Sequence, residues 1–165
     1  MASRRIDDLV PELQILANKF LEECKKVELP FFITCTARSI QEQTALYAQG
    51  RQSLDEVNRL RKAANMPDIT EKENKKPVTW TMASKHIVNL YDNNPNNDKA
   101  RAFDIALLDK NGKATWDVKI SVNKNKIPDY EEAGAIGEKL GLKWGGRFKD
   151  KNGKPKPDYS HFELE

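Results

Sequence analysis

The sequence predicts an α+β fold, a compact domain in which helices pack against a small, mostly antiparallel sheet. An amphipathic helical pattern opens the chain and a second helix is expected close to its end, and short β-rich segments lie between and after them. The 165 residues also match the length of one ordinary domain. We therefore expect residues 1–165 to form a single domain.

Most elements of the first third are predicted to be helical. Apolar residues recur at steps of three and four over residues 6–24, which indicates an amphipathic helix. Residues 31–36 are aromatic and β-branched and predict a buried strand. Ser39, with Glu42 three residues later, has the pattern of a capping box and predicts a short helix. Another helix is expected from Ser53.

The remainder alternates short strands with turns. We expect strands at residues 77–80, 101–108, 115–118 and 159–164. The asparagine-rich segment 91–98 has the composition of a surface loop. A helix is predicted over residues 130–140, with Gly141 as its C-terminal cap.

Composition excludes several function classes. The formal net charge is only +3, which argues against a nucleic-acid-binding protein. The sequence contains no apolar run of about 18 residues that could span a membrane. The N-terminal residues are basic but lack the apolar stretch of a signal peptide, so we expect a cytoplasmic protein. Cys24 and Cys35 lack the spacing of redox or zinc pairs and are expected to be buried free thiols.

Three residues form a candidate metal site. His86 and His161 are the two histidines of the sequence, and Asp104 interrupts an otherwise apolar strand. A catalytic zinc ion typically takes three protein ligands, and a carboxylate in an apolar strand needs a partner. The spacing by itself is a weak signal, because lone histidines and strand aspartates are often structural.

The sequence resembles the VanY and D-Ala-D-Ala carboxypeptidase group of zinc peptidases, which includes phage L-alanyl-D-glutamate endopeptidases. The resemblance rests on segments in the family's order, namely TARSIQEQTALYAQGR (36–51), SKH (84–86), ARAFD (100–104), GLKWGG (141–146) and DYSHFE (158–163). It departs from the family in two places. Eighteen positions separate His86 from Asp104, where the family has about seven, and Ala100 replaces a glycine.

The resemblance implies a hedgehog/DD-peptidase-like fold and a site for Zn²⁺. His86, Asp104 and His161 would be the metal ligands, and Asp158 the catalytic base. Arg38, Gln43 and Ser84 are the candidate substrate-binding residues, although a structural salt bridge for Arg38 and helix packing for Gln43 remain alternatives. Glu163 is the rival of Asp158, because alternation places it on the same strand face as His161.

These features predict a zinc-dependent peptidoglycan hydrolase that cleaves the L-Ala–D-Glu bond of the stem peptide. We expect a monomeric phage endolysin without a separate wall-binding domain, held in the host cytoplasm until a holin-type pore releases it to the cell wall. A D-Ala-D-Ala carboxypeptidase and an inactive wall-binding module are the alternatives. Residues 143–157 carry a net charge of +5, which indicates either a solvated loop or attraction to anionic envelope polymers.

Overall fold

The computed structural model describes residues 2–89, 94 and 96–165. Its helices are α1 (Pro11–Lys26), α2 (Ile40–Ala48), α3 (Leu54–Ala63) and α4 (Asp129–Lys139), and its strands are β1 (Phe31–Cys35), β2 (Ala102–Leu108), β3 (Ala114–Thr115), β4 (Lys143–Trp144) and β5 (His161–Glu163). Short 3₁₀ helices occupy Ile6–Asp8, Glu73–Lys75 and Gly145–Arg147. None of the helices described is long and apolar enough to cross a membrane.

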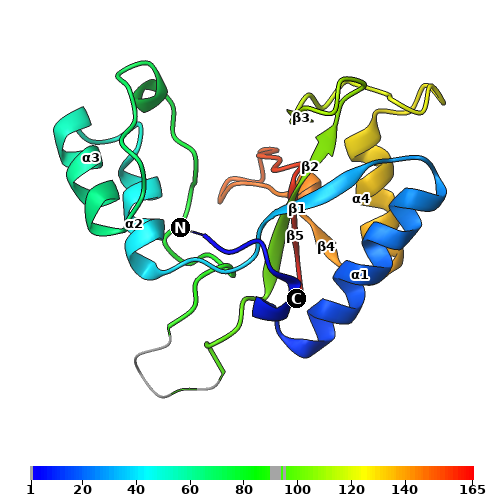
Figure 1. The fold of residues 1–165 in the computed structure, drawn as a ribbon, viewed down its shortest axis with the longest axis horizontal. Helices are drawn as coiled ribbons and strands as arrows, with labels where there is room; N and C mark the ends of the chain where they lie inside the picture. The colour runs from blue at the N-terminus through cyan, green and yellow to red at the C-terminus, as the bar shows by residue number, and fades with distance from the viewer. Residues whose placement is uncertain (1, 90–93, 95) are drawn as a thin grey trace.

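One antiparallel sheet organises these elements. Its strand order is β1-β2-β5-β4, and β3 pairs with the far end of β2. Helices α1 and α4 cover one face of this sheet (Figure 1). The α+β fold with a small antiparallel sheet packed by helices is therefore confirmed.

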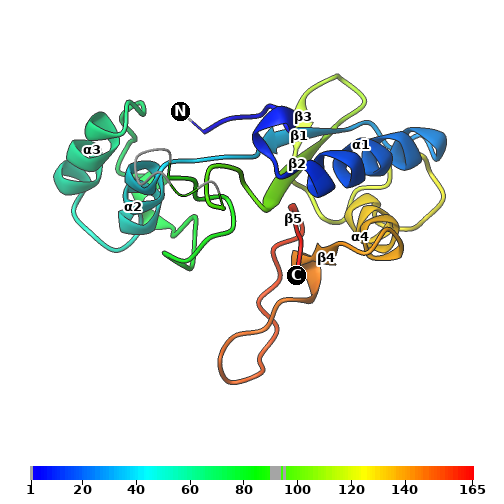
Figure 2. The same ribbon diagram turned by 90° about the horizontal axis from the view of Figure 1, so that it is seen from below.

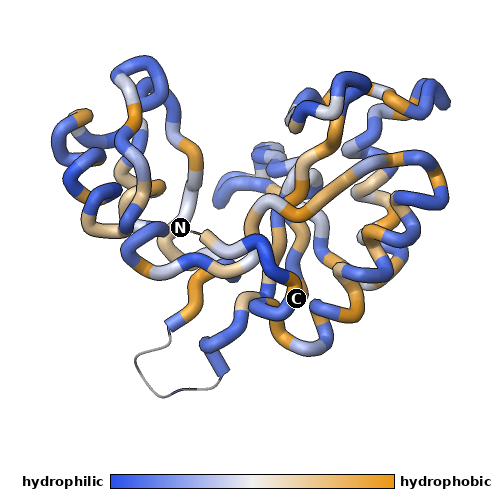
Figure 3. Tube along the Cα trace, in the orientation of Figure 1, coloured by the Kyte–Doolittle hydropathy of each residue, from blue (hydrophilic) through white to orange (hydrophobic). Residues whose placement is uncertain are grey.

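The main core lies between the sheet and helices α1 and α4, and in Figure 3 hydrophobic stretches alternate with hydrophilic ones along both helices. The Phe20 ring of α1 lies 5.8 Å from that of Phe103 and 4.7 Å from that of Phe162, measured between ring centroids. Helix α4 approaches the sheet closely through glycines. A Cβ atom on Gly137 would lie 2.3 Å from the Phe162 ring, so this position requires the absence of a side chain.

Helices α2 and α3 form a second layer on the other side of β1, set apart from α1 and α4 (Figures 1 and 2). The predicted capping box begins α2. The Ser39 side chain accepts a hydrogen bond from the Glu42 backbone N–H, and the Glu42 carboxylate accepts one from the Ser39 N–H. Ser53 caps α3 in the same way, by accepting from the Glu56 N–H.

Several predicted elements differ from the structure. Residues 77–80 form no strand. Distant side chains bind Thr79 instead: Arg51 donates to its carbonyl and Gln43 to its hydroxyl oxygen. The two-residue strand β4 was not predicted. Residues 91–93 and 95 of the asparagine-rich segment 91–98 lie outside the described residues, so the predicted surface loop is not tested there; residues 94 and 96 are exposed.

The predictions for the cysteines and for Gly141 agree with the structure. Cys24 and Cys35 are both buried and neither forms a disulfide. Burial, assisted by nearby glutamates, raises the pKa of the Cys24 thiol to about 12, which makes it an inert core residue. Gly141 follows α4 with a φ of +89°, the conformation that a C-terminal cap requires.

Candidate metal centre and active site

The register of the sheet brings three residues from distant parts of the sequence into one row. Asp104 on β2 is paired directly with His161 on β5 and, across the other edge, with Cys35 on β1. A bulge between Ile33 and Cys35 produces the second pairing, because it inserts one extra residue into β1. Since alternate strand residues face opposite sides, Asp104 points away from the face on which Phe103 and Ile105 pack into the core.

His86 reaches this row from a loop that is fixed by backbone hydrogen bonds. The Arg38 N–H donates to the His86 carbonyl at 2.9 Å, and the Val88 N–H donates to the Arg38 carbonyl at 3.0 Å. These bonds form a short parallel bridge between Arg38, which follows β1, and Ile87 of the loop. The bridge fixes the loop beside the segment that follows β1, and the His86 side chain is buried beside Asp104.

The side-chain atoms of His86, Asp104 and His161 converge. His86 Nε2 lies 3.2 Å from Asp104 Oδ1 and 3.2 Å from His161 Nδ1, and His161 Nδ1 lies 3.1 Å from Asp104 Oδ1. Three ligands of a tetrahedral zinc site, with bonds of about 2.0–2.1 Å, would be separated by about 3.3–3.4 Å. The three donor atoms thus nearly form one face of such a tetrahedron.

The outer nitrogen of each histidine ring has its own acceptor. His86 Nδ1 lies 2.7 Å from the Thr36 carbonyl, and His161 Nε2 lies 3.0 Å from Glu163 Oε2. A ring that donates its N–H outward presents a bare lone pair on its other nitrogen, which is the arrangement expected of metal-binding histidines. Two such lone pairs and a carboxylate oxygen facing one another require a positive charge between them.

The electrostatics indicate the same demand for a cation. Burial opposes charging of His86, but the adjacent Asp104 carboxylate outweighs it and raises the pKa of His86 to about 10. Burial likewise opposes ionisation of Asp104, yet the two histidines hold the pKa of its carboxyl far below the ordinary value. A proton or a metal ion could supply the charge, and the donor set fits a metal ion.

Cys35 adds a sulfur atom beside this site. One donor atom each from Cys35, His86 and Asp104 form a group within 4.8 Å of one another, so these residues could hold a metal ion. The sulfur lies 3.7 Å from His86 Nδ1, the nitrogen that faces the Thr36 carbonyl. It is therefore beside the outer nitrogen of the ring, away from His161. No sequence pattern indicates this placement, because it depends on the bulge in β1.

Arg38 is paired within the protein. Its Nη2 lies 3.2 Å from Asp104 Oδ2 and 3.1 Å from Cys35 Sγ, and its Nη1 donates to Gln43 Oε1 at 3.1 Å. The guanidinium is only 11% exposed. Arg38 lines the cavity, but these contacts favour the structural alternative, in which it orients Asp104.

Of the other two candidate substrate-binding residues, Ser84 lines the cavity and Gln43 is buried outside it. Gln43 is completely buried, and its amide donates to Thr79 Oγ1 and to the Thr81 carbonyl. It braces the 79–81 segment, so the helix-packing alternative describes it better than substrate contact does. Ser84 lines the cavity, and its hydroxyl accepts a hydrogen bond from the His86 N–H.

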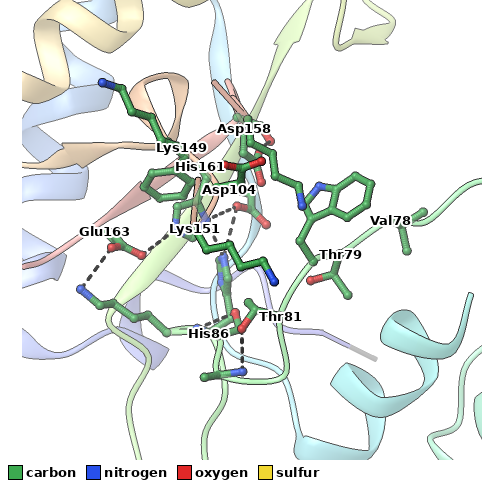
Figure 4. Close-up of a pocket in the computed structure, with 18 of the residues that line it drawn as sticks. Val78, Thr79, Thr81, His86, Asp104, Lys149, Lys151, Asp158, His161 and Glu163 are labelled. Atoms are coloured by element: carbon green, nitrogen blue, oxygen red, sulfur yellow. Dashed lines mark hydrogen bonds and ion pairs between the residues drawn. The ribbon is translucent and has the colours of Figure 1, made fainter. Parts of the chain in front are cut away.

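The two candidate carboxylates have contrasting surroundings. Glu163 is buried and contacts His161, Lys85 and Lys143. Burial opposes its ionisation, but His161 and Lys85 lower its pKa to about 2. Asp158 precedes β5, is exposed, and accepts a hydrogen bond from the Ser160 hydroxyl. Figure 4 shows Asp158 on the same side of the cavity as Asp104 and His161.

A cavity of about 680 Å³ opens over these residues. One wall comes from residues 78–86 and the other from residues 148–163, with His86, Asp104 and His161 at its base. The second wall includes the loop that projects from the sheet in Figure 2. Residues that could hold a metal ion thus line a cavity large enough for a small-molecule or peptide ligand.

Comparison with known proteins agrees with this geometry. Residues 96–164 match the profile of a family described as D-alanyl-D-alanine carboxypeptidase, and this segment contains Asp104, Asp158 and His161. The family resemblance is confirmed. Residues 96–164 are thus similar to a family of peptidases. The comparison with curated protein sequences gave no match.

Two solved structures share the fold. The L-Ala D-Glu endopeptidase ChiX of Serratia marcescens aligns with a TM-score of 0.52 and 15% identity, over 100% of this chain and 89% of that one. The LD-carboxypeptidase LdcB aligns with a TM-score of 0.50 and 13% identity, over 94% of this chain. This chain spans 58% of the length of LdcB. At these identities, the likeness establishes the fold.

Proposed function

We propose that this protein is a zinc-dependent peptidoglycan hydrolase that cleaves the L-Ala–D-Glu bond of the stem peptide. The observation that carries the proposal is the convergence of His86, Asp104 and His161, whose three donor atoms lie 3.1–3.2 Å apart while both outer ring nitrogens face acceptors. Histidine nitrogens with one carboxylate oxygen are a donor set that suits zinc.

The chain's own residues supply the remaining parts of a hydrolytic site. His86, Asp104 and His161 would hold the zinc ion, which when bound acidifies a water molecule and polarises a peptide carbonyl. Asp158 takes a proton from the attacking water and returns it to the leaving amine, as a general base and then a general acid. Arg38 fixes the Asp104 carboxylate, and Glu163 fixes the His161 ring.

The choice of bond rests on two supports. The structure that aligns over the whole of this chain is named an L-Ala D-Glu endopeptidase. The upstream block 36–51 and the order of the motifs resemble the endopeptidases that phages use as endolysins. We therefore also propose the phage endolysin role, with release from the host cytoplasm to the cell wall.

A second candidate is a D-Ala-D-Ala carboxypeptidase, which the description of the matching family favours. Digestion of purified peptidoglycan, followed by mass analysis of the fragments, separates the two. Loss of the whole peptide beyond L-Ala supports the endopeptidase, whereas loss of a terminal D-Ala alone supports the carboxypeptidase. Walls that remain intact in the presence of zinc would contradict both.

A further inference from the structure

Five cationic side chains line the cavity: Arg38, Lys85, Lys149, Lys151 and Lys156. The two at its base are occupied by acidic groups of the protein. Arg38 pairs with Asp104, and Lys85 pairs with Glu163 at 3.2 Å while also bonding the Leu164 carbonyl. Neither is free to bind a negatively charged substrate group.

The remaining lysines lie on the projecting loop of the second wall. Lys149 and Pro155 pair as an antiparallel bridge, and the Lys156 N–H donates to the Phe148 carbonyl, so the loop is a short hairpin. Lys156 crosses the cavity mouth, with its ammonium 4.0 Å from the centre of the Trp80 ring. This cation–π contact joins the two walls.

The acidic residue of this hairpin, Asp150, stabilises the turn. One carboxylate oxygen of Asp150 accepts from the Asn152 and Lys154 backbone N–H groups, so this side chain serves the turn. Among the described residues, neither Lys149 nor Lys151 has an acidic partner within ion-pair distance. Lys151 lines the cavity together with His161 and Asp104, and in Figure 4 its ammonium end is directed toward Thr81.

We propose that Lys151 binds the carboxylate that the substrate carries on the residue following the scissile bond. This inference deepens the proposed function and rests on it. In the stem peptide, D-Glu continues the chain through its γ-carboxyl, so its α-carboxylate is free and adjacent to the L-Ala–D-Glu bond. Lys151 then determines specificity, because it distinguishes this free carboxylate from the uncharged carboxamide found in amidated walls.

The test compares two soluble stem peptides that differ only in that group, a D-Glu α-carboxylate and its carboxamide. The wild-type protein should cleave the carboxylate peptide with the higher kcat/KM. Lys151→Ala should lower kcat/KM for the carboxylate peptide about ten- to a hundredfold, mainly through KM, and leave the carboxamide peptide unaffected. Lys154→Ala is the matched control, because it removes the same charge from the same hairpin outside the cavity.

Other outcomes overturn the inference. Equal losses on both peptides from Lys151→Ala would show that it acts through a neighbour such as Asp158. Equal losses from Lys151→Ala and Lys154→Ala would indicate diffuse attraction to anionic polymers. A wild-type protein that cleaves both peptides equally retains the proposed function without this specificity. If zinc-loaded wild type neither cleaves nor, by calorimetry, binds either peptide, the proposed function fails as well.

Discussion

Oε2 of Glu163 lies 3.0 Å from Nε2 of His161, two residues earlier on β5. Strand alternation places both side chains on one face, and Lys85 and Lys143 contact the other carboxylate oxygen of Glu163. A carboxylate with three partners is held in place and has its charge satisfied. Glu163 is therefore suited to orient His161, and the proposed function assigns proton transfer to the exposed Asp158.

This division of roles predicts the effects of two substitutions. Asp158→Asn should keep zinc and fold yet lose at least about 10²-fold in kcat, the low end for removal of a general base. Glu163→Gln should cost less in turnover and more in zinc affinity, by about 10- to 100-fold. Turnover on a stem peptide and a zinc titration of each variant provide the measurements. A nearly active Asp158→Asn with an inactive but zinc-loaded Glu163→Gln would reverse the assignment.

Metal content provides the second prediction. The purified protein should carry about one zinc per chain, and chelation should abolish hydrolysis. His86→Ala and His161→Ala should each lose both metal and activity. Because zinc would bind only the folded state, its removal should lower the free energy of unfolding, by about 4 kcal/mol at a thousandfold excess over Kd. Metal analysis and thermal melts with and without zinc test this, and stoichiometric zinc in either variant would refute the ligand assignment.

The close approach of α4 to the sheet provides a stability prediction. In Gly137→Ala the new methyl group would lie 2.3 Å from the Phe162 ring, so either the helix or the ring must move. Overpacking of this kind costs about 1–3 kcal/mol, which outweighs the gain of up to about 1 kcal/mol in helix propensity. Urea unfolding measures the difference. Ala135→Gly, at an exposed position of the same helix, calibrates the propensity contribution, and a more stable Gly137→Ala would show that the contact relaxes freely.

Asp129 at the start of α4 predicts a pH dependence. Burial raises the pKa of its carboxyl, whose Oδ1 has no partner among the described residues. The folded state therefore binds this proton more tightly than the unfolded chain, so the contribution of Asp129 to stability falls as pH rises from about 4 through the raised value. The free energy of unfolding of the wild type minus that of Asp129→Asn should decrease between pH 4 and 7. A difference that is constant over this range would contradict the prediction.

Much of the fold could be predicted from local signals. The capping box at Ser39 and the glycine after α4 marked helix ends correctly, because the groups that satisfy the terminal backbone atoms lie within a few residues in sequence. The strand predicted at residues 77–80 was wrong because the interactions that decide its conformation are not local. Its β-branched composition favours a strand, but Thr79 is bound by Gln43 and Arg51, distant side chains that no local pattern reveals.

The residues of the candidate site could be predicted from the sequence, but the hydrogen bonds and contacts among them could not. Motif order singled out His86, Asp104 and His161. The pairing of Arg38 with Asp104 and the position of Cys35 depend on a one-residue bulge, which shifts the register without altering the composition of the strand. The position of Lys151 over the cavity likewise depends on the geometry of a turn.

The row formed by Cys35, Asp104 and His161 also has a consequence for folding. These residues lie on three adjacent strands, yet they come from widely separated parts of the chain, so the site has a high contact order. A slip of one residue in the pairing of β2 with β5 would turn His161 to the opposite face of the sheet. Only two of the three candidate metal ligands, His86 and Asp104, would then remain together. On the proposed function, metal binding would therefore require the correct register of the sheet, and a collapsed chain in which β5 has not paired with β2 would be inactive.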